Sequence, residues 1–132
     1  MREIKFRGRR TDRKWAYGYL FILPSGDHYI YDTINKKEYL VDDPVTAGQY
    51  IGLKDNHNRG KEIYKGDIVR ITAVCGEEYV GEVAWDELRL GWAVDCNDLE
   101  ELYDFATIIH CGHLVELLGN VHDHPELLER NP

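Results

Sequence analysis

Two short segments near the C-terminus carry the residue types that could bind a metal ion. They read His110-Cys111-Gly112-His113 and His122-Asp123-His124. Residues two apart on a strand share a face, so four side chains could supply the nitrogen and sulfur ligands of tetrahedral zinc: Cys111, His113, His122 and His124. A zinc-dependent hydrolase is therefore one function that the sequence allows. We favour the alternative of surface histidines near a turn, and we expect no bound metal and no cofactor.

Other catalytic motifs are incomplete or missing in the sequence. The pattern G-x-x-x-x-G-K-[ST] does not occur, which excludes a P-loop enzyme. Glu3-Ile4-Lys5 matches the second half of a nuclease-type metal motif, but no aspartate precedes it. Ser25 is the single serine and lies in a predicted turn, outside any G-x-S-x-G pattern. We therefore expect no catalytic residues and a protein that is not an enzyme.

Basic residues gather at the start of the chain and acidic residues at its end. Residues 1–15 contain seven basic and two acidic residues, a net charge of +5, whereas residues 76–132 contain two basic and fourteen acidic residues, a net charge of −12. Such an asymmetry arises when a basic face binds nucleic acid, or when two parts of one fold neutralise each other. We favour neutralisation. In the nucleic-acid alternative, the contacts come from a basic N-terminal hairpin: Arg2, Lys5, Arg7, Arg9, Arg10, Arg13 and Lys14.

The segment after this basic stretch predicts a strand with one aromatic face. Trp15, Tyr17, Tyr19 and Phe21 alternate with smaller or aliphatic residues, which is the period of a β-strand. Four aromatic rings beside arginines could form a stacking platform for single-stranded nucleic acid. Few other large side chains lie in this half, so we expect these rings to form the hydrophobic core instead.

The remaining elements must position these residues, and most of them are predicted strands. At 132 residues the chain fits a single domain. Short runs of alternating residues separated by turns, at intervals near ten residues, are typical of a small antiparallel barrel or roll. A helix is predicted around Leu99–Ala106 after the capping-box-like pair Asp98 and Glu101, and a second short helix begins at Pro125.

Hydropathy and cysteine usage indicate where the protein resides. No apolar run approaches the roughly 18 residues of a membrane span, so we expect no membrane partner. Cys75, Cys96 and Cys111 are odd in number and form no C-x-x-C pair, which argues against a secreted disulfide framework. We expect a cytoplasmic protein.

The stretch Gln49–Arg70, QYIGLKDNHNRGKEIYKGDIVR, packs turn and strand signals closely together. Gly66 permits a turn with positive φ, and the Asp67 side chain can accept from backbone donors in that turn, so we interpret this pair as structural. The stretch resembles the signature of the YopX family of phage and prophage proteins, and the resemblance recurs at Arg2–Arg7 and at Val115–Leu128.

The resemblance implies one YopX-like domain over residues 1–132, with a basic N-terminal β layer at 1–48 and a barrel core at 49–132. The implied fold is mainly β: a small antiparallel SH3-like barrel or roll, centred on Glu62–Asp95, with an added N-terminal hairpin layer and one or two short helices. The resemblance carries over no established activity. Polar and amphipathic residues of the signature stretch form our candidate binding surface: Gln49, Tyr50, Lys54, Asp55, Glu62 and Asp67.

Together these observations favour a non-catalytic phage or prophage accessory protein that binds a phage or host protein, or itself. Exposed strand edges would allow self-association into a ring or dimer, so we expect a homo-oligomer or a protein partner. Nucleic-acid binding is the alternative, and the zinc hydrolase is the third hypothesis.

Overall fold

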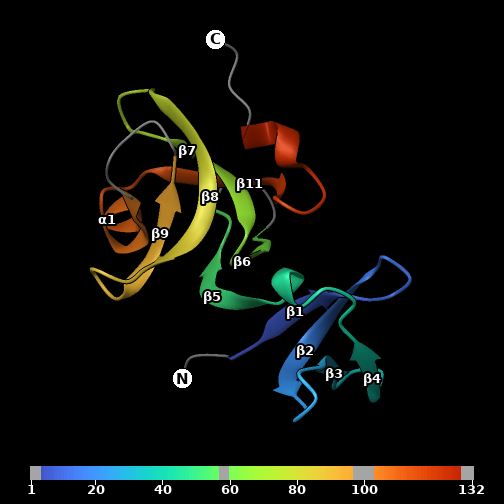
Figure 1. Cartoon of the computed structure of the whole chain (residues 1–132). Coiled ribbons are helices and arrows are strands. Elements are labelled where there is room, and N and C mark those ends of the chain that lie inside the picture. The colour runs from blue at the N-terminus through green and yellow to red at the C-terminus, as the bar shows by residue number, and fades with distance from the viewer. Residues whose placement is uncertain (1–3, 57–59, 97–102, 129–132) are drawn as a thin grey trace. The chain divides into compact units, whose positions relative to one another are not determined.

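Figure 1 shows the computed structural model of the chain, which describes residues 4–56, 60–96 and 103–128. The chain divides into two compact units, residues 1–52 (unit 1) and residues 53–132 (unit 2). Strands dominate both units, so the prediction of a mainly β protein is confirmed. Within the described ranges, no helix is long and apolar enough to cross a membrane.

Unit 1 is built on antiparallel strands in the order β4-β3-β2-β1-β5. The 3-10 helix η1 (Pro44–Thr46) precedes β5, and Asp43 caps it by accepting from the backbone N–H of Val45 at 3.1 Å. The strands are β1 (Phe6–Arg9), β2 (Trp15–Ile22), β3 (His28–Asp32), β4 (Lys37–Leu40) and β5 (Gly48–Lys54), which continues into unit 2.

The core of unit 1 lies on the face of β2 opposite to the one that we predicted. Ala16, Ile30 and Val41 form the buried cluster, and Phe6, Leu20 and Tyr39 pack against it. The rings of β2 point away from this cluster, and Tyr17 and Tyr19 are 45% and 58% exposed. The prediction that the aromatic face forms the core is therefore wrong.

The curvature of the sheet explains why the smaller residues are inside. A bridge between Arg10 and Val41 draws the end of β4 back to the end of β1. The space enclosed is narrow: a Cβ added at Gly8 would lie 2.7 Å from Cγ2 of Val41. Because Gly8 pairs with Ala16 on this inner side, aromatic rings fit on the outer side only.

Unit 2 contains an antiparallel sheet in the order β10-β9-β8-β7-β11 (Figure 1). Strand β7 lies between β8 and β11 and is buried on both faces, with Ile68 and Val69 fully inaccessible. Val83, Val94 and Val115 extend this core across the neighbouring strands. The strands are β6 (Glu62–Tyr64), β7 (Asp67–Thr72), β8 (Glu78–Asp86), β9 (Gly91–Asp95), β10 (Tyr103–Asp104) and β11 (Leu114–Asn120).

Two short helices accompany this sheet. Helix α1 (Phe105–His110) packs beside β9 and β10, and it buries Phe105 and Ile108. It begins later than predicted, because Asp104 is its N-cap and Tyr103 belongs to a strand. The predicted caps Asp98 and Glu101 lie outside the described residues. The second helix, η2 (Pro125–Leu128), occupies the predicted residues as a 3-10 helix.

The finer prediction of an SH3-like barrel is not established by this architecture. In the described part of the chain, the strands form two antiparallel sheets and no closed barrel. The predicted boundary between residues 48 and 49 and the division between the two units both lie within β5.

The turn between β6 and β7 positions the most buried polar residue of the signature stretch. Gly66 adopts φ +89°, a conformation that favours glycine. The Asp67 carboxylate accepts a hydrogen bond from the backbone N–H of Tyr64 at 2.7 Å, and Asp67 is 1% exposed. The structural interpretation of Gly66 and Asp67 is therefore confirmed.

Candidate functional site

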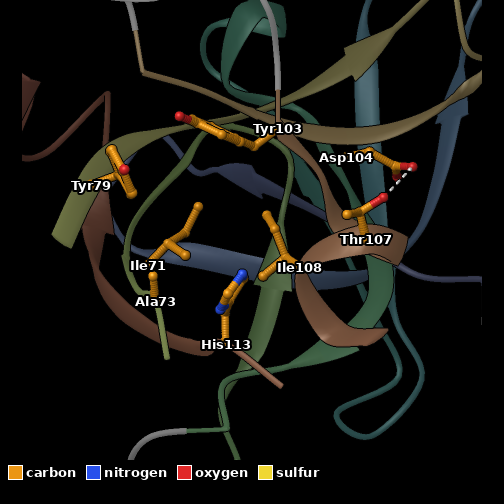
Figure 2. Close-up of a pocket in the computed structure, with 8 residues that line it drawn as sticks. All are labelled: Ile71, Ala73, Tyr79, Tyr103, Asp104, Thr107, Ile108 and His113. Carbon is orange, nitrogen blue, oxygen red and sulfur yellow. Dashed lines mark hydrogen bonds between the residues drawn. The ribbon is translucent and has the colours of Figure 1, made fainter. Parts of the chain in front are cut away.

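A cavity of about 190 Å³ opens in unit 2 between the sheet, α1 and the segment that follows the helix (Figure 2). We call it the Tyr79 pocket. Elements far apart in the sequence build it, and its lining is predominantly apolar. The lining residues are Ile71, Ala73, Tyr79, Tyr103, Asp104, Thr107, Ile108 and His113.

The hydrophobic surfaces of the pocket come from two aliphatic and two aromatic side chains. Ile71 of β7 and Ile108 of α1 are each 3% exposed and face each other across the cavity (Figure 2). Tyr79 and Tyr103 form another wall, with ring centroids 5.4 Å apart and planes tilted by 41°. Ile71 and Tyr79 lie opposite each other in the β7–β8 ladder, which fixes their side chains on the same face of the sheet.

His113 supplies a polar group inside this apolar environment. Its Nδ1 accepts a hydrogen bond from the backbone N–H of Val74 at 3.2 Å. In the neutral ring the proton therefore resides on Nε2. The imidazole projects into the pocket between Ile71 and Ile108 (Figure 2), so it can offer one N–H donor to a bound group.

The polar groups at the rim are held by the fold. Asp104 caps α1 by accepting from the backbone N–H of Ala106 at 3.0 Å, and it also accepts from Thr107 Oγ1 at 3.4 Å. The Tyr79 hydroxyl donates to the Glu77 carboxylate. This hydrogen bond raises the pKa of Tyr79 to about 12, with smaller contributions from burial and from the charge of Glu77. Tyr79 is thus a neutral phenol at physiological pH.

This arrangement is suited to binding. A nucleophile requires an activating base within hydrogen-bond reach, and the hydrogen bonds of Asp104 and His113 described above go to the backbone or to a neighbouring threonine. An apolar cavity with a few directed polar groups is the usual form of a ligand site. A cavity of roughly 150 Å³ accepts a benzene ring, so this one can receive one bulky apolar group.

The candidate binding surface of the signature stretch divides into accessible and buried residues. Lys54 is exposed, and Gln49 and Glu62 are half-buried. Tyr50, Asp55 and Asp67 are 5%, 4% and 1% exposed, and burial removes them from direct reach of a large partner. A binding role for the accessible three stays a prediction.

Asp55 and its neighbour Asn56 contact the edge strand β11. The Asn56 side chain accepts from the backbone N–H of Val115 at 2.6 Å and donates to the carbonyl of His113 at 3.2 Å. Its backbone N–H donates to the carbonyl of Val115 at 3.1 Å. These two residues therefore satisfy groups that an edge strand would otherwise leave open.

The four candidate zinc ligands do not assemble into a site. No group of three or more histidine, cysteine, aspartate or glutamate residues is placed to hold a metal ion within the described ranges. His113 projects into the Tyr79 pocket, Cys111 is the exposed C-cap of α1, and the imidazole of His124 lies against Gly119. The zinc-hydrolase hypothesis thus has no metal centre in this part of the chain.

Several candidate nucleic-acid contacts are occupied within unit 1. The guanidinium carbons of Arg7 and Arg9 lie 4.8 and 5.1 Å from the ring centroid of Trp15. Arg10 lies 4.0 Å from the ring centroid of Tyr39 and forms an ion pair with Asp12 at 2.7 Å. Arg13 and Lys14 are exposed in the turn between β1 and β2. Of the predicted contacts that the structure describes, these two are the most accessible.

Sequence reasoning did not identify the Tyr79 pocket. Its lining residues lie between positions 71 and 113 on three strands, a helix and two loops, so no local spacing links them. The sequence marks His113 as a metal-ligand candidate and assigns no specific role to Asp104. No signal in the sequence links Tyr79 to Tyr103, because the strand β9 lies between their elements.

Comparison with known proteins identifies the family and no close curated relative. A family model described as YopX protein matches residues 5–129. Among curated proteins, a sequence search finds no match to this chain. The family match covers nearly the full length of the chain and includes both units, so the protein belongs to the YopX family.

Proposed function

We propose that this protein is a non-catalytic phage or prophage accessory protein that binds a protein partner through the Tyr79 pocket. The partner inserts one bulky apolar side chain between Ile71 and Ile108, against the rings of Tyr79 and Tyr103. The observation that carries the proposal is a preformed apolar cavity of about 190 Å³ with one inward-facing imidazole. An imidazole N–H in that position suits a backbone carbonyl beside the inserted side chain.

The charge of unit 2 favours a basic partner. Unit 2 contains seventeen acidic and seven basic residues. Glu77 and Asp104 lie beside or within the pocket lining. Complementary charges accelerate association and select the correct partner. We therefore expect lysine or arginine residues on either side of the inserted side chain.

Self-association is a separate prediction, and the strand edges bear on it. The backbone groups of β11 that face Asp55 and Asn56 are already hydrogen-bonded within the chain. A satisfied edge does not recruit a second copy through strand pairing. This favours a partner held through side chains over self-association through β11, and light scattering of the purified protein measures the oligomeric state.

Methyl NMR tests the proposal with a defined probe. N-acetyl-phenylalanine amide presents one bulky side chain beside two carbonyl groups. Its titration should shift the methyl resonances of Ile71 and Ile108 in a saturable manner and leave those of Ile30 in the core of unit 1 unchanged. Shifts spread evenly over both units, or no shift at millimolar probe, would contradict the proposal.

A matched pair of variants separates pocket binding from general surface effects. Ala73→Leu adds bulk to the pocket lining and should abolish the probe-induced shifts. Val74→Leu adds a methylene at the next position, which is 76% exposed and outside the lining, and should leave them intact. The same pair applies to a pull-down from phage-infected extract: a true partner is retained by Val74→Leu, lost with Ala73→Leu and insensitive to nuclease.

A further inference from the structure

The outer surface of unit 1 carries a group of aromatic side chains that the core does not use. Tyr19 pairs with Tyr31 and Phe21 pairs with Tyr29 across β2 and β3, so their rings share one face. Contiguous exposed apolar surface on a small protein marks an interaction site. We call this surface the aromatic face; it comprises Trp15, Tyr17, Tyr19, Phe21, Tyr29 and Tyr31.

The spacing of these rings suits an unstacked polynucleotide. Tyr17, Tyr19 and Phe21 alternate along β2, so neighbouring side chains are about 6.8 Å apart. This is about twice the 3.4 Å rise per base of a stacked strand. Phe21 and Tyr29 are already stacked, with centroids 5.4 Å apart and planes inclined by 11°. A strand of nucleic acid lying along β2 would therefore separate its bases and stack each one on a protein ring.

Cations cluster at one end of the aromatic face. The β1–β2 turn contributes Arg13 and Lys14, the β3–β4 turn contributes Lys36, and β4 begins with Lys37; all four are exposed. The antiparallel order of β1 to β4 places both turns at the end of the sheet nearest Trp15. Unit 1 as a whole contains nine basic and seven acidic residues, in contrast to acidic unit 2.

We propose that the aromatic face of unit 1 binds single-stranded DNA, with bases on Tyr17, Tyr19 and the Phe21–Tyr29 pair and phosphates at the cationic end. Tyr17 and Tyr19 are exposed, and Phe21 and Tyr29 are half-buried. Accessible rings combined with cations are what sequence-tolerant single-strand binders use. Stacking of bases on these rings needs no contact to a 2′-hydroxyl, so single-stranded DNA satisfies the face without further groups. The site lies in unit 1, so it is independent of the Tyr79 pocket.

Fluorescence anisotropy of a dye-labelled oligothymidylate of about 20 nucleotides, with the full chain, measures the binding. If three or four phosphates are neutralised, affinity should fall roughly 20- to 50-fold between about 50 and 200 mM salt. The same length of duplex should bind more weakly, because its bases cannot reach the rings. Salt-independent binding, preference for duplex, or a tenfold preference for matching RNA would overturn the proposal.

Substitutions of Tyr19 test whether stacking contributes. Tyr19→Ala removes a ring that is 58% exposed, so it should spare the fold and weaken binding by about fivefold or more. Tyr19→Phe retains the ring and should bind like the unmodified protein. Equal losses in both variants would assign the effect to the hydroxyl and overturn a stacking role. Leu88→Ala, at a 96% exposed site in unit 2, is the control for surface substitution.

Substitutions of single charges test the phosphate contacts. Lys14→Gln should weaken binding at low salt and reduce its salt dependence, whereas Lys61→Gln, at an exposed site in unit 2, should do neither. Glu38 pairs with Tyr31 and so shares the aromatic face, and Glu38→Gln should strengthen binding. Equal behaviour of the two lysine variants would overturn the proposal, because it would show that no phosphate contact is specific to the cationic end. If oligothymidylate fails to bind and Tyr19→Ala abolishes capture of a protein, the face is a protein-docking surface and the proposal also fails.

Discussion

The Asp55 carboxylate accepts a hydrogen bond from the backbone N–H of Leu117, with Oδ2 and N separated by 2.6 Å. Residues 55 and 117 belong to segments that are 62 positions apart, and Asp55 is 4% exposed. The side chain thus takes the place of a neighbouring strand at the edge of β11. The residue type of Asp55 suggested a surface contact, but its burial and this hydrogen bond give it a structural role.

Replacing Asp55 by alanine should destabilise unit 2 and open its edge. Loss of the acceptor leaves the Leu117 N–H unsatisfied, which should lower the free energy of unfolding by about 1–3 kcal/mol. Urea denaturation measures this loss, and light scattering should detect new self-association. Asp42→Ala, at an exposed carboxylate in unit 1, is the control and should change neither quantity. Equal stability of the two variants would refute the role assigned to Asp55.

Gly66→Ala should destabilise the protein through backbone conformation alone. At φ +89° a side chain costs about 1–2 kcal/mol, whereas the nearest contact of an added Cβ, 3.6 Å from His122 Nε2, is an ordinary one. Gly91→Ala is the matched control, because its Cβ would meet nothing within 4 Å and its φ lies outside the left-handed region. Thermal denaturation should therefore distinguish the two variants, with Gly91→Ala close to the unmodified protein.

Glu82 should make stability decrease as pH rises. Burial, and secondarily the charge of Asp95 opposite it on β9, raises the pKa of Glu82 above its usual value, while Lys65 acts in the other direction. The folded state then retains a proton that the unfolded state has released, so stability falls from the ordinary carboxyl pKa up to the folded one. Glu82→Gln should flatten this slope in urea denaturation series. An unchanged slope would show that Glu82 does not contribute to it.

Tyr79 should ionise at a higher pH than an ordinary tyrosine. Its pKa is raised to about 12 chiefly by the hydrogen bond to Glu77. Glu77→Ala removes both the acceptor and the negative charge and should return the pKa toward the ordinary tyrosine value of 10.0. Difference spectra between the unmodified protein and Tyr79→Phe, recorded by ultraviolet absorbance during alkaline titration, isolate this phenol. If Glu77→Ala leaves its titration unaltered, the hydrogen bond is not the cause.

The sequence predicted the strand at Trp15–Ile22 correctly but assigned the wrong face to the core. Period-two alternation identifies two faces without stating which one is enclosed. The decisive signal was the small residues: Gly8 pairs with Ala16, and only residues of this size fit beneath Val41 where the sheet curls. By surface area alone, the large rings of β2 are the better candidates for the core. The tight curvature of the sheet, which is a tertiary property, places the small residues there instead.

Local chemistry was predicted better than long-range assembly. Gly66 and Asp67 lie in one turn, so their roles follow from neighbours in the sequence. Asp55 depends on Leu117, and the Tyr79 pocket depends on elements from β7 to His113, so their roles arise only when distant strands meet. The zinc hypothesis failed for the same reason, because alternation within each segment could not place His113 beside His124.

The pairing of β7 with β11 also governs the order in which the chain can acquire its structure during synthesis. The strand pairs of unit 1 join residues within the first 52 positions, whereas Thr72 finds its partner only at Leu114 and Asp67 at Asn120. Contacts of large sequence separation form slowly, and domains fold as they emerge from the ribosome. Unit 1 can therefore mature early. One edge of β7 can pair with β8 soon after synthesis, while its other edge waits for β11 and so for nearly the whole polypeptide. During that interval the apolar strand β7 is the segment best suited to bind a chaperone.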